Sequence, residues 1–309
     1  MSSKKAHISY YSMRIGAVVA RIVPMRLGYS LAQIVGDAFY LLLARQRRIV
    51  SENLNYVMGE SSNEEQSQQK TRGVFRSMTK SYFELIKLPY LNFETMGQDV
   101  TVHGYQHLET AVNNGKGTII ATAHLGTFEM CAHILAARGI KMTIFVEEFD
   151  SSPFLSHVAE LRGGNGVKIV PIGPGTLRES LRLLRDGGTV TIVCDRDIQG
   201  TGTKARFFGE ETLLPVGAIN LALRTGATII PVFSVRQASH QSEVFIEPPL
   251  DMIDIGKHSR SVKENLEKLV AVMEKYIRQY PEQWIVMEPV WNNKTQAQAP
   301  IPAKRGCDD

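Results

Sequence analysis

The chain has 309 residues, 43% of which are hydrophobic, and a formal net charge of +4. This length and composition suffice for a substantial core in one large or two small domains, and they exclude a mainly disordered protein. Three cysteines, Cys131, Cys194 and Cys307, show no metal-ligand spacing. We expect them to be reduced, and we predict neither a metal site nor a cofactor.

The N-terminal part is basic and partly apolar. Residues 1–60 contain eight Lys or Arg against three Asp or Glu. A stripe of apolar residues with helical spacing runs over Leu27–Leu42 and is followed by Arg45, Arg47 and Arg48. Its longest charge-free run has ten residues, about half of the roughly 20 that a membrane-spanning helix needs. Arginines interrupt the apolar part and no cleavage site follows, so we expect neither a spanning helix nor a cleaved signal.

An amphipathic helix with a basic end can lie in the interface of an anionic membrane. The alternative is an ordinary helix packed on the domain, and both interpretations can hold together.

The next part of the chain predicts an α/β fold. Residues 61–69 read as a polar connection, and Lys70–Leu88 as a helix that Pro89 ends. Strands and helices then alternate, which predicts a mainly parallel mixed sheet flanked by helices. The predicted strands are 100–103, a segment from 118, 141–146, 168–172, 189–194, 228–235 and 243–246, and a long helix covers 259–279. We therefore divide the chain into basic amphipathic N-terminal helices (1–60), an α/β domain (61–291) and a disordered tail (292–309).

A strand that begins at Thr118 runs directly into a helix start and carries His124 and Glu129 to its C-terminal end. Open α/β sheets place their chemistry at this edge. Thr127 is a suitable N-cap, which puts Glu129 in the first helical turn, where the helix dipole favours a carboxylate. Five positions on one helix would turn the two side chains about 140° apart, so a contact requires His124 to lie in the turn.

An imidazole held by a carboxylate is a positioned general base that can deprotonate a hydroxyl. The alternative is that His124 packs at the strand end while Glu129 is solvated.

Further candidates follow along the chain. Arg162 ends a predicted helix, and its guanidinium can bind a phosphate or carboxylate bidentately; alternatively it is an exposed helix-end residue. Asp195 leaves the 189–194 strand at the same sheet edge as His124. Asp195-Arg196-Asp197 is similar to the DXD motif of metal-dependent glycosyltransferases, or it forms a solvated turn. The Phe207-Phe208-Gly209 segment is an apolar wall or part of the core.

Several blocks together resemble one family. His124–Glu129 resembles the HX4D/E motif of the bacterial lipid A biosynthesis acyltransferases, a family that includes the lauroyl and myristoyl transferases and the phosphatidylinositol mannoside acyltransferases. Similar blocks follow in the same order over 195–197, 206–209, 214–217, 223–232 and 281–284. The resemblance covers about residues 10–291. It departs after Trp284, where Val286-Met287-Glu288-Pro289 replaces the basic tail usual in the lipid A enzymes.

The resemblance implies a glycerolipid-acyltransferase-like enzyme, monotopic on the cytoplasmic face of the bacterial inner membrane. It would move a long-chain acyl group from acyl-CoA or acyl-carrier protein to a sugar hydroxyl of a membrane glycolipid, such as a lipid A precursor or a phosphatidylinositol mannoside. The partners would be this donor, the glycolipid acceptor and the membrane surface, with no nucleic acid.

The implied site has His124 as general base and Glu129 as the residue that orients it. Supporting or substrate-binding positions are Arg162, Asp195, Asp197, Arg206 and Phe208. Asp195 would orient the histidine or bind the acceptor. Because no suitable nucleophile is visible, we expect no acyl-enzyme, and backbone amides near Gly126 are the candidate oxyanion donors.

Two other classes stay open. One is a metal-dependent glycosyltransferase that uses Asp195 and Asp197, whose activity a chelator would abolish. The other is a lipid-binding or lipid-transfer protein without chemistry, in which His124→Ala would leave lipid extraction unchanged.

Overall fold

The computed structural model describes residues 21–59, 63–95, 100–147, 153–164, 166–173, 175–197, 200–238 and 241–291. The predicted tail from residue 292 and the first twenty residues lie outside this part of the chain. The domain boundaries at 60 and 291 stay predictions.

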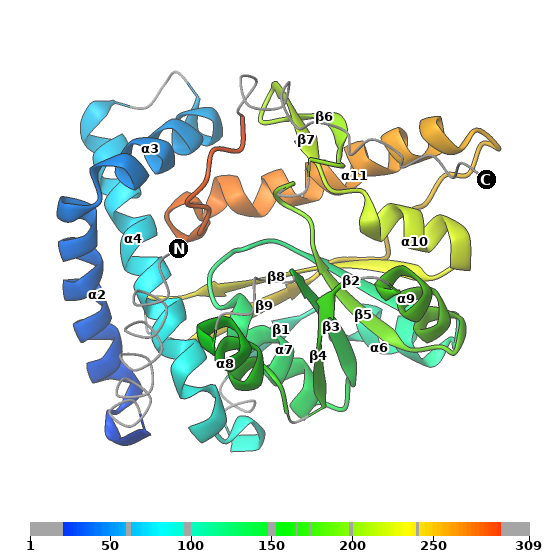
Figure 1. Cartoon of the computed structure of the whole chain (residues 1–309), viewed down its shortest axis with the longest axis horizontal. Helices are drawn as coiled ribbons and strands as arrows, with labels where there is room; N and C mark the ends of the chain where they lie inside the picture. The colour runs from blue at the N-terminus through cyan, green and yellow to red at the C-terminus, as the bar shows by residue number, and fades with distance from the viewer. Residues whose placement is uncertain are drawn as a thin grey trace, which may run out of the picture.

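A seven-stranded sheet with the order β1-β9-β8-β2-β5-β3-β4 forms the centre of the molecule (Figure 1). All neighbouring strands are parallel except β8 and β9, which are antiparallel. The mainly parallel mixed sheet predicted from the sequence is therefore confirmed. Its strands are β1 (Thr101–His103), β2 (Thr118–Thr122), β3 (Met142–Glu147), β4 (Val167–Ile172), β5 (Thr189–Val193), β8 (Thr228–Arg236) and β9 (Ser242–Ile246).

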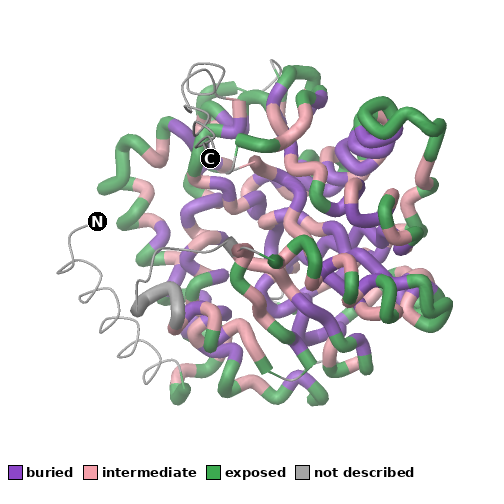
Figure 2. Tube along the Cα trace, turned by 45° about the vertical axis from the view of Figure 1, so that its right-hand side comes forward, coloured by how far each residue is buried: buried purple, intermediate pink, exposed green. Residues whose placement is uncertain are grey.

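Helices cover both faces of the sheet, as the alternating side chains of β2 show. Ile119 packs in a core cluster with residues of α9 (Thr176–Arg185), α10 (Gly217–Thr225) and α11 (His258–Gln279). Ile120 points to the opposite face and packs with residues of α6 (Tyr105–Asn113), α7 (Phe128–Ala137) and α8 (Pro153–Arg162). Buried residues concentrate accordingly in the strands and the inner helix faces (Figure 2).

Two elements differ from the prediction. The helix expected to begin at Lys70 is α4 (Glu64–Lys87), because the Asn63 side chain accepts the Gln66 N–H at 2.8 Å and caps a start in the run predicted to be a connection. An antiparallel hairpin, β6 (Thr203–Phe207) and β7 (Glu210–Leu214), was not predicted. Its turn holds Phe208 at a left-handed φ of 51°.

The N-terminal helices α2 (Met25–Leu42) and α3 (Ala44–Met58) pack beside α4 (Figure 1). The buried face of α2 consists of Gly28, Tyr29, Ala32 and Gly36. A Cβ on Gly36 would lie 2.7 Å from the Arg76 Cα, so only glycine allows this approach of the two helices.

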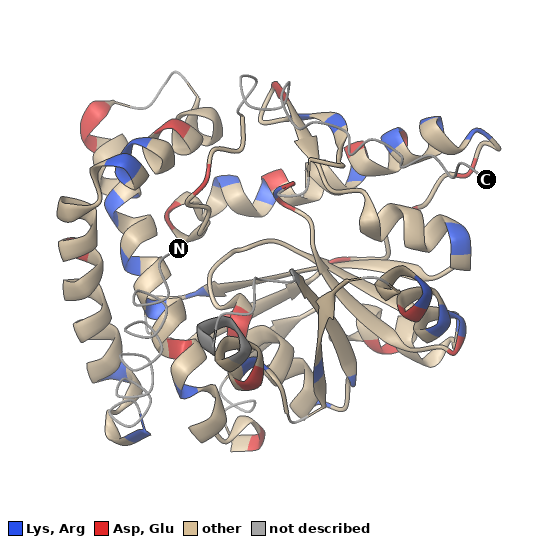
Figure 3. Cartoon of the chain, in the orientation of Figure 1, with Lys and Arg blue, Asp and Glu red and all other residues tan. Residues whose placement is uncertain are grey.

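The apolar stripe predicted over Leu27–Leu42 lies on the other side of α2 and is exposed. Ile34 is 66% exposed and Leu41 70%. The helix carries almost no charged residues (Figure 3). Within the described ranges no single helix is long and apolar enough to cross a membrane; α2 and α3 pass such a test only as a pair, bent by 98°.

Candidate active site

His124 lies in the turn between β2 and α7, at the C-terminal edge of the sheet. The turn is tight: Gly126 has a φ of +58°, and a Cβ there would meet the Ser234 carbonyl oxygen at 2.2 Å. A later segment of the chain fixes the turn. The Ile285 N–H donates to the His124 carbonyl at 2.8 Å, and the Gly126 N–H donates to the Gln283 carbonyl at 3.0 Å.

Asp195 holds the His124 ring. The Asp195 Oδ1 lies 2.9 Å from His124 Nδ1, and its Oδ2 accepts the His124 backbone N–H at 3.0 Å and the Trp284 indole N–H at 2.8 Å. The carboxylate is fully buried. Burial alone would raise the pKa of Asp195, but attraction to His124 and these hydrogen bonds outweigh it and hold the pKa below its usual value.

The ionised Asp195 accepts hydrogen bonds only, so His124 Nδ1 carries a proton, and in the neutral ring the lone pair is on Nε2. The His124 side chain remains 22% exposed. The ring can therefore reach a substrate through Nε2.

Glu129 does not orient His124, which corrects the prediction. Its carboxylate binds Arg162 of α8 bidentately: Arg162 Nε donates to Oε2 at 2.9 Å, and Nη2 donates to Oε1. Glu129 lies in the first turn of α7, and its side chain reaches Arg162 at the end of α8. The contact expected between His124 and Glu129 is made instead by Asp195.

The helix start also differs in detail. Thr127 occupies the N-cap position of α7, but its side chain does not cap the helix and instead hydrogen-bonds the Ser234 hydroxyl. The bond ties the turn to β8.

The backbone amides near Gly126 are already engaged. The Leu125 N–H donates to the Ala123 carbonyl at 2.7 Å, the Gly126 N–H to Gln283, and the Thr127 N–H to the Ser234 carbonyl at 3.3 Å. These three amides therefore do not form the expected oxyanion hole in this conformation.

Asp197 and Arg206 lie outside the His124 network. The Asp197 side chain accepts the Gly202 N–H at 2.7 Å and so closes a loop, while Arg206 is exposed in β6 opposite Glu211. The Asp195 carboxylate is directed to His124 and Trp284, whereas the Asp197 carboxylate is directed to Gly202. Across the described ranges there is no group of three or more His, Cys, Asp or Glu placed to hold a metal ion.

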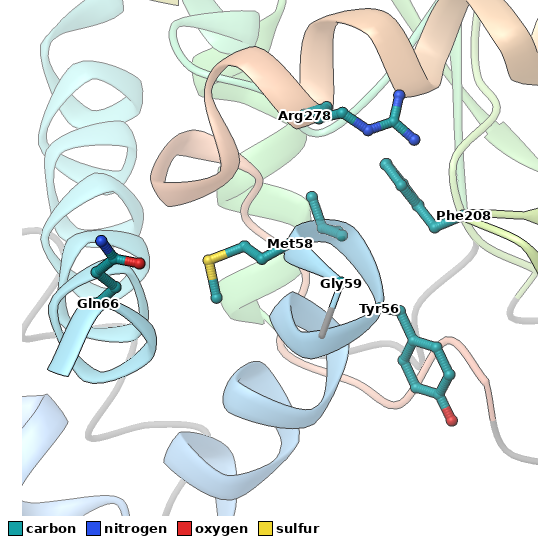
Figure 4. A pocket seen from close by; sticks show the side chains of 7 residues that line it. Tyr56, Met58, Gly59, Gln66, Phe208 and Arg278 are labelled. Carbon is teal, nitrogen blue, oxygen red and sulfur yellow. The ribbon is translucent and has the colours of Figure 1, made fainter. Parts of the chain in front are cut away.

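Phe208 belongs to an aromatic cluster that includes Trp284, the residue that donates to Asp195. Its ring packs against Phe207 and Trp284, with centroid separations of 4.6 and 6.4 Å. Figure 4 shows that Phe208 and Arg278 also face a cavity of about 540 Å³ beside Tyr56 and Met58. The Arg278 guanidinium lies 5.1 Å from the centre of the Phe208 ring.

Sequence reasoning missed three residues near this edge. Trp284 donates to Asp195, and its only signal was its place in the Pro281–Trp284 block. Arg196 forms an ion pair with Glu288. Tyr82 of α4 is half exposed. Its partial desolvation raises its pKa, and the charges of Arg162, Glu129, Glu288 and Arg196 also act on it.

The chain is similar in sequence to known lipid acyltransferases. A family model described as bacterial lipid A biosynthesis acyltransferase matches residues 2–293. A phosphatidylinositol mannoside acyltransferase of Mycobacterium tuberculosis (strain CDC 1551 / Oshkosh) is 27% identical over 218 residues, covering 67% of this chain and 66% of that protein. One from Mycolicibacterium smegmatis is 25% identical over 225 residues, covering 71% of each chain. The match thus spans about two thirds of the length of these relatives.

Proposed function

Because this chain belongs to the bacterial lipid A biosynthesis acyltransferase family, we propose that it transfers a long-chain acyl group from a thioester donor, acyl-CoA or acyl-carrier protein, to a sugar hydroxyl of a membrane glycolipid. The observation that carries the proposal is the His124–Asp195 pair, with Nε2 available to a substrate. The printed names of the relatives make a phosphatidylinositol mannoside one acceptor to test, and the family description makes a lipid A precursor another.

In the proposed reaction, His124 Nε2 removes the proton of the acceptor hydroxyl as its oxygen attacks the thioester carbonyl. Asp195 stays ionised and stabilises the imidazolium through Nδ1–H. The tetrahedral intermediate then collapses, the carbon–sulfur bond breaks, and the imidazolium returns the proton to the departing thiolate. The hydroxyl becomes an ester and the donor leaves as a thiol.

The two cysteines that the structure describes support direct transfer without an acyl-enzyme. Cys131 and Cys194 are buried, and burial raises the pKa of each thiol to about 12. Thiols with such pKa values are almost fully protonated at neutral pH and are therefore poor nucleophiles.

We assign Glu129 and Arg162 a supporting role. Their side chains are 8% and 25% exposed, and their ion pair joins the first turn of α7 to the end of α8. Because a buried carboxylate is stable only with its partner, the pair fixes the helix that follows the His124 turn.

In this proposal α2 contacts the membrane. Its exposed apolar face, which includes Leu27, Leu31, Ile34 and Leu41, is the surface that a glycolipid-modifying enzyme would insert into the bilayer interface. Arg45 is exposed and can face anionic headgroups, and Arg48 can do so by leaving its exposed ion pair with Glu52. Arg47 Nη1 instead donates to the Tyr40 carbonyl at 2.7 Å and so satisfies the end of α2. Because the proposed donors, acyl-CoA and acyl-carrier protein, are cytoplasmic, the enzyme would bind the cytoplasmic face of the inner membrane.

The test is His124→Ala, assayed by mass spectrometry of acylated glycolipid formed from acyl-CoA or acyl-carrier protein. Loss of a general base lowers the rate by roughly 10²–10⁴-fold. The control is His103→Ala, which removes a half-exposed histidine of β1 that pairs with Glu243. A folded His124→Ala protein with a near-normal rate would refute the mechanism, and lipid extraction without acylated product would point to a lipid-transfer protein.

A further inference from the structure

Arg196 follows the residue that holds the catalytic histidine, and its guanidinium is incompletely satisfied. Its Nη1 donates to Glu288. Its Nε is buried and has no hydrogen-bond partner within the part of the chain that the structure describes. Buried donors are normally paired, because an unmet one carries the full desolvation penalty. The contact with Glu288 therefore leaves part of the Arg196 guanidinium unsatisfied beside the catalytic edge.

The carboxylate that now contacts Arg196 can be replaced. The Glu288 side chain is 63% exposed, whereas that of Arg196 is 23% exposed. An exposed carboxylate that leaves the pair returns to water, so its displacement costs little on the Glu288 side. The backbone of Glu288 is held in place independently, because Asn53 Nδ2 donates to its carbonyl at 2.8 Å and the Val290 N–H donates to Asn53 Oδ1 at 3.2 Å. Only the carboxylate has to move to free the guanidinium.

Arg162, the other arginine at this edge, lacks this property. Its partner Glu129 is only 8% exposed and is gripped bidentately. Displacing Glu129 would leave a buried carboxylate without its charge partner. An incoming anion would therefore meet less resistance at Arg196 than at Arg162, where the sequence predicted such binding.

We propose that Arg196 binds a phosphate group of a substrate and that Glu288 occupies the guanidinium until the substrate arrives. The proposal rests on the acyltransferase function above, in which both the thioester carrier and a phosphoinositide acceptor contain phosphate esters. A phosphate presents more oxygens in the geometry that a guanidinium prefers, so it outcompetes a single exposed carboxylate.

Equilibrium binding by isothermal titration calorimetry tests this without turnover. Two soluble probes separate the sources of phosphate: coenzyme A for the donor and glycerophosphoinositol for the acceptor. Arg196→Gln should weaken one of them by roughly tenfold to a hundredfold, and the affected probe identifies the substrate. Arg260→Gln is the control, because Arg260 forms an exposed pair with Glu264.

Glu288→Gln should have the opposite effect on the affinity for the probe. Removing the competing carboxylate should tighten binding of the same probe by up to about fivefold. Glu211→Gln, which removes a similarly exposed carboxylate paired with Lys204, should change nothing. The proposal is overturned if neither probe binds the wild-type protein at millimolar concentration, if Arg196→Gln binds both probes normally, or if Glu288→Gln fails to tighten the probe. Failure of the acyltransferase function would instead show as full activity of His124→Ala.

Discussion

Asp195→Asn separates the chemical role of the buried carboxylate from its role in packing. The amide has the same shape and can still accept hydrogen bonds at one oxygen, which suits the two donors now on Oδ2, the His124 backbone N–H and the Trp284 indole. The amide nitrogen would then face His124 Nδ1. Because that nitrogen is a donor, it favours the tautomer with the proton on Nε2 and so removes the lone pair that accepts the substrate proton.

We therefore expect kcat to fall by roughly 10²–10⁴-fold, the value of a general base. The free energy of unfolding should fall by about 1.5–3 kcal/mol, the range for losing one hydrogen bond to a charged group. The pKa of Asp195 is lowered in the folded protein, so its ionised form stabilises the fold above the unfolded value of about 3.9. That contribution disappears as the pH falls through the lowered folded-state pKa, so the stability difference between wild type and variant should shrink in acid.

The assay is acyl-product formation at saturating donor, together with urea unfolding at neutral and acid pH. Asp254→Asn serves as a control, because Asp254 accepts the Gly256 N–H in a surface loop. An Asp195→Asn protein that unfolds normally and keeps more than about a tenth of the wild-type kcat would refute the assignment of Asp195 as the orienting residue.

Three more perturbations test other parts of the structure. Arg162→Lys should lower thermal stability and activity together, because an ammonium cannot reproduce the bidentate grip on Glu129; unchanged melting and rate would show that the ion pair is dispensable. Lys80→Met should raise the melting temperature at pH 7, because burial, aided by Arg236, lowers the pKa of Lys80 to about 8. The charged lysine destabilises the fold fully below pH 8, and this effect fades as the pH rises toward the unfolded-state pKa of about 10.4. A gain in melting temperature that does not depend on pH would contradict this cause. Ile34→Gln with Leu41→Gln should weaken binding to anionic liposomes by at least tenfold without loss of folding, since both side chains are exposed; equal binding in a flotation assay would show that α2 is not the membrane contact.

The sheet and the place of His124 were predictable because both depend on local patterns. The strands that cross the sheet centre are continuous apolar runs, as expected when both faces are covered. The β2 run ends at Thr122, and a histidine two positions later must lie at the C-terminal edge. The hairpin β6–β7 escaped prediction because its polar residues and left-handed Phe208 turn lack the Asn-Gly or Asp-Gly signal of a short hairpin.

The partner of His124 was assigned from spacing and could not be settled that way. Glu129 and Asp195 both reach the same edge, one five residues away and one 71 residues away. Which of them contacts the ring depends on the side-chain direction at the start of α7 and on the position of Arg162 at the end of α8. Both depend on tertiary structure, which spacing along the chain does not determine. A motif that contains a histidine and a carboxylate therefore identifies the members of a site without identifying which members touch.

The orientation of α2 shows a second limit of pattern reading. Apolar periodicity found a stripe over Leu27–Leu42 and left open whether it packs on the domain or meets a membrane. The domain is instead contacted by Gly28, Ala32 and Gly36, spaced four residues apart, which allow the α2 backbone close to α4. Small residues create a helix interface by proximity and contribute little to a hydrophobic pattern. In the described part of the chain the buried face of α2 therefore excludes the stripe, and we propose that its large exposed apolar side chains are the surface that a bilayer interface covers.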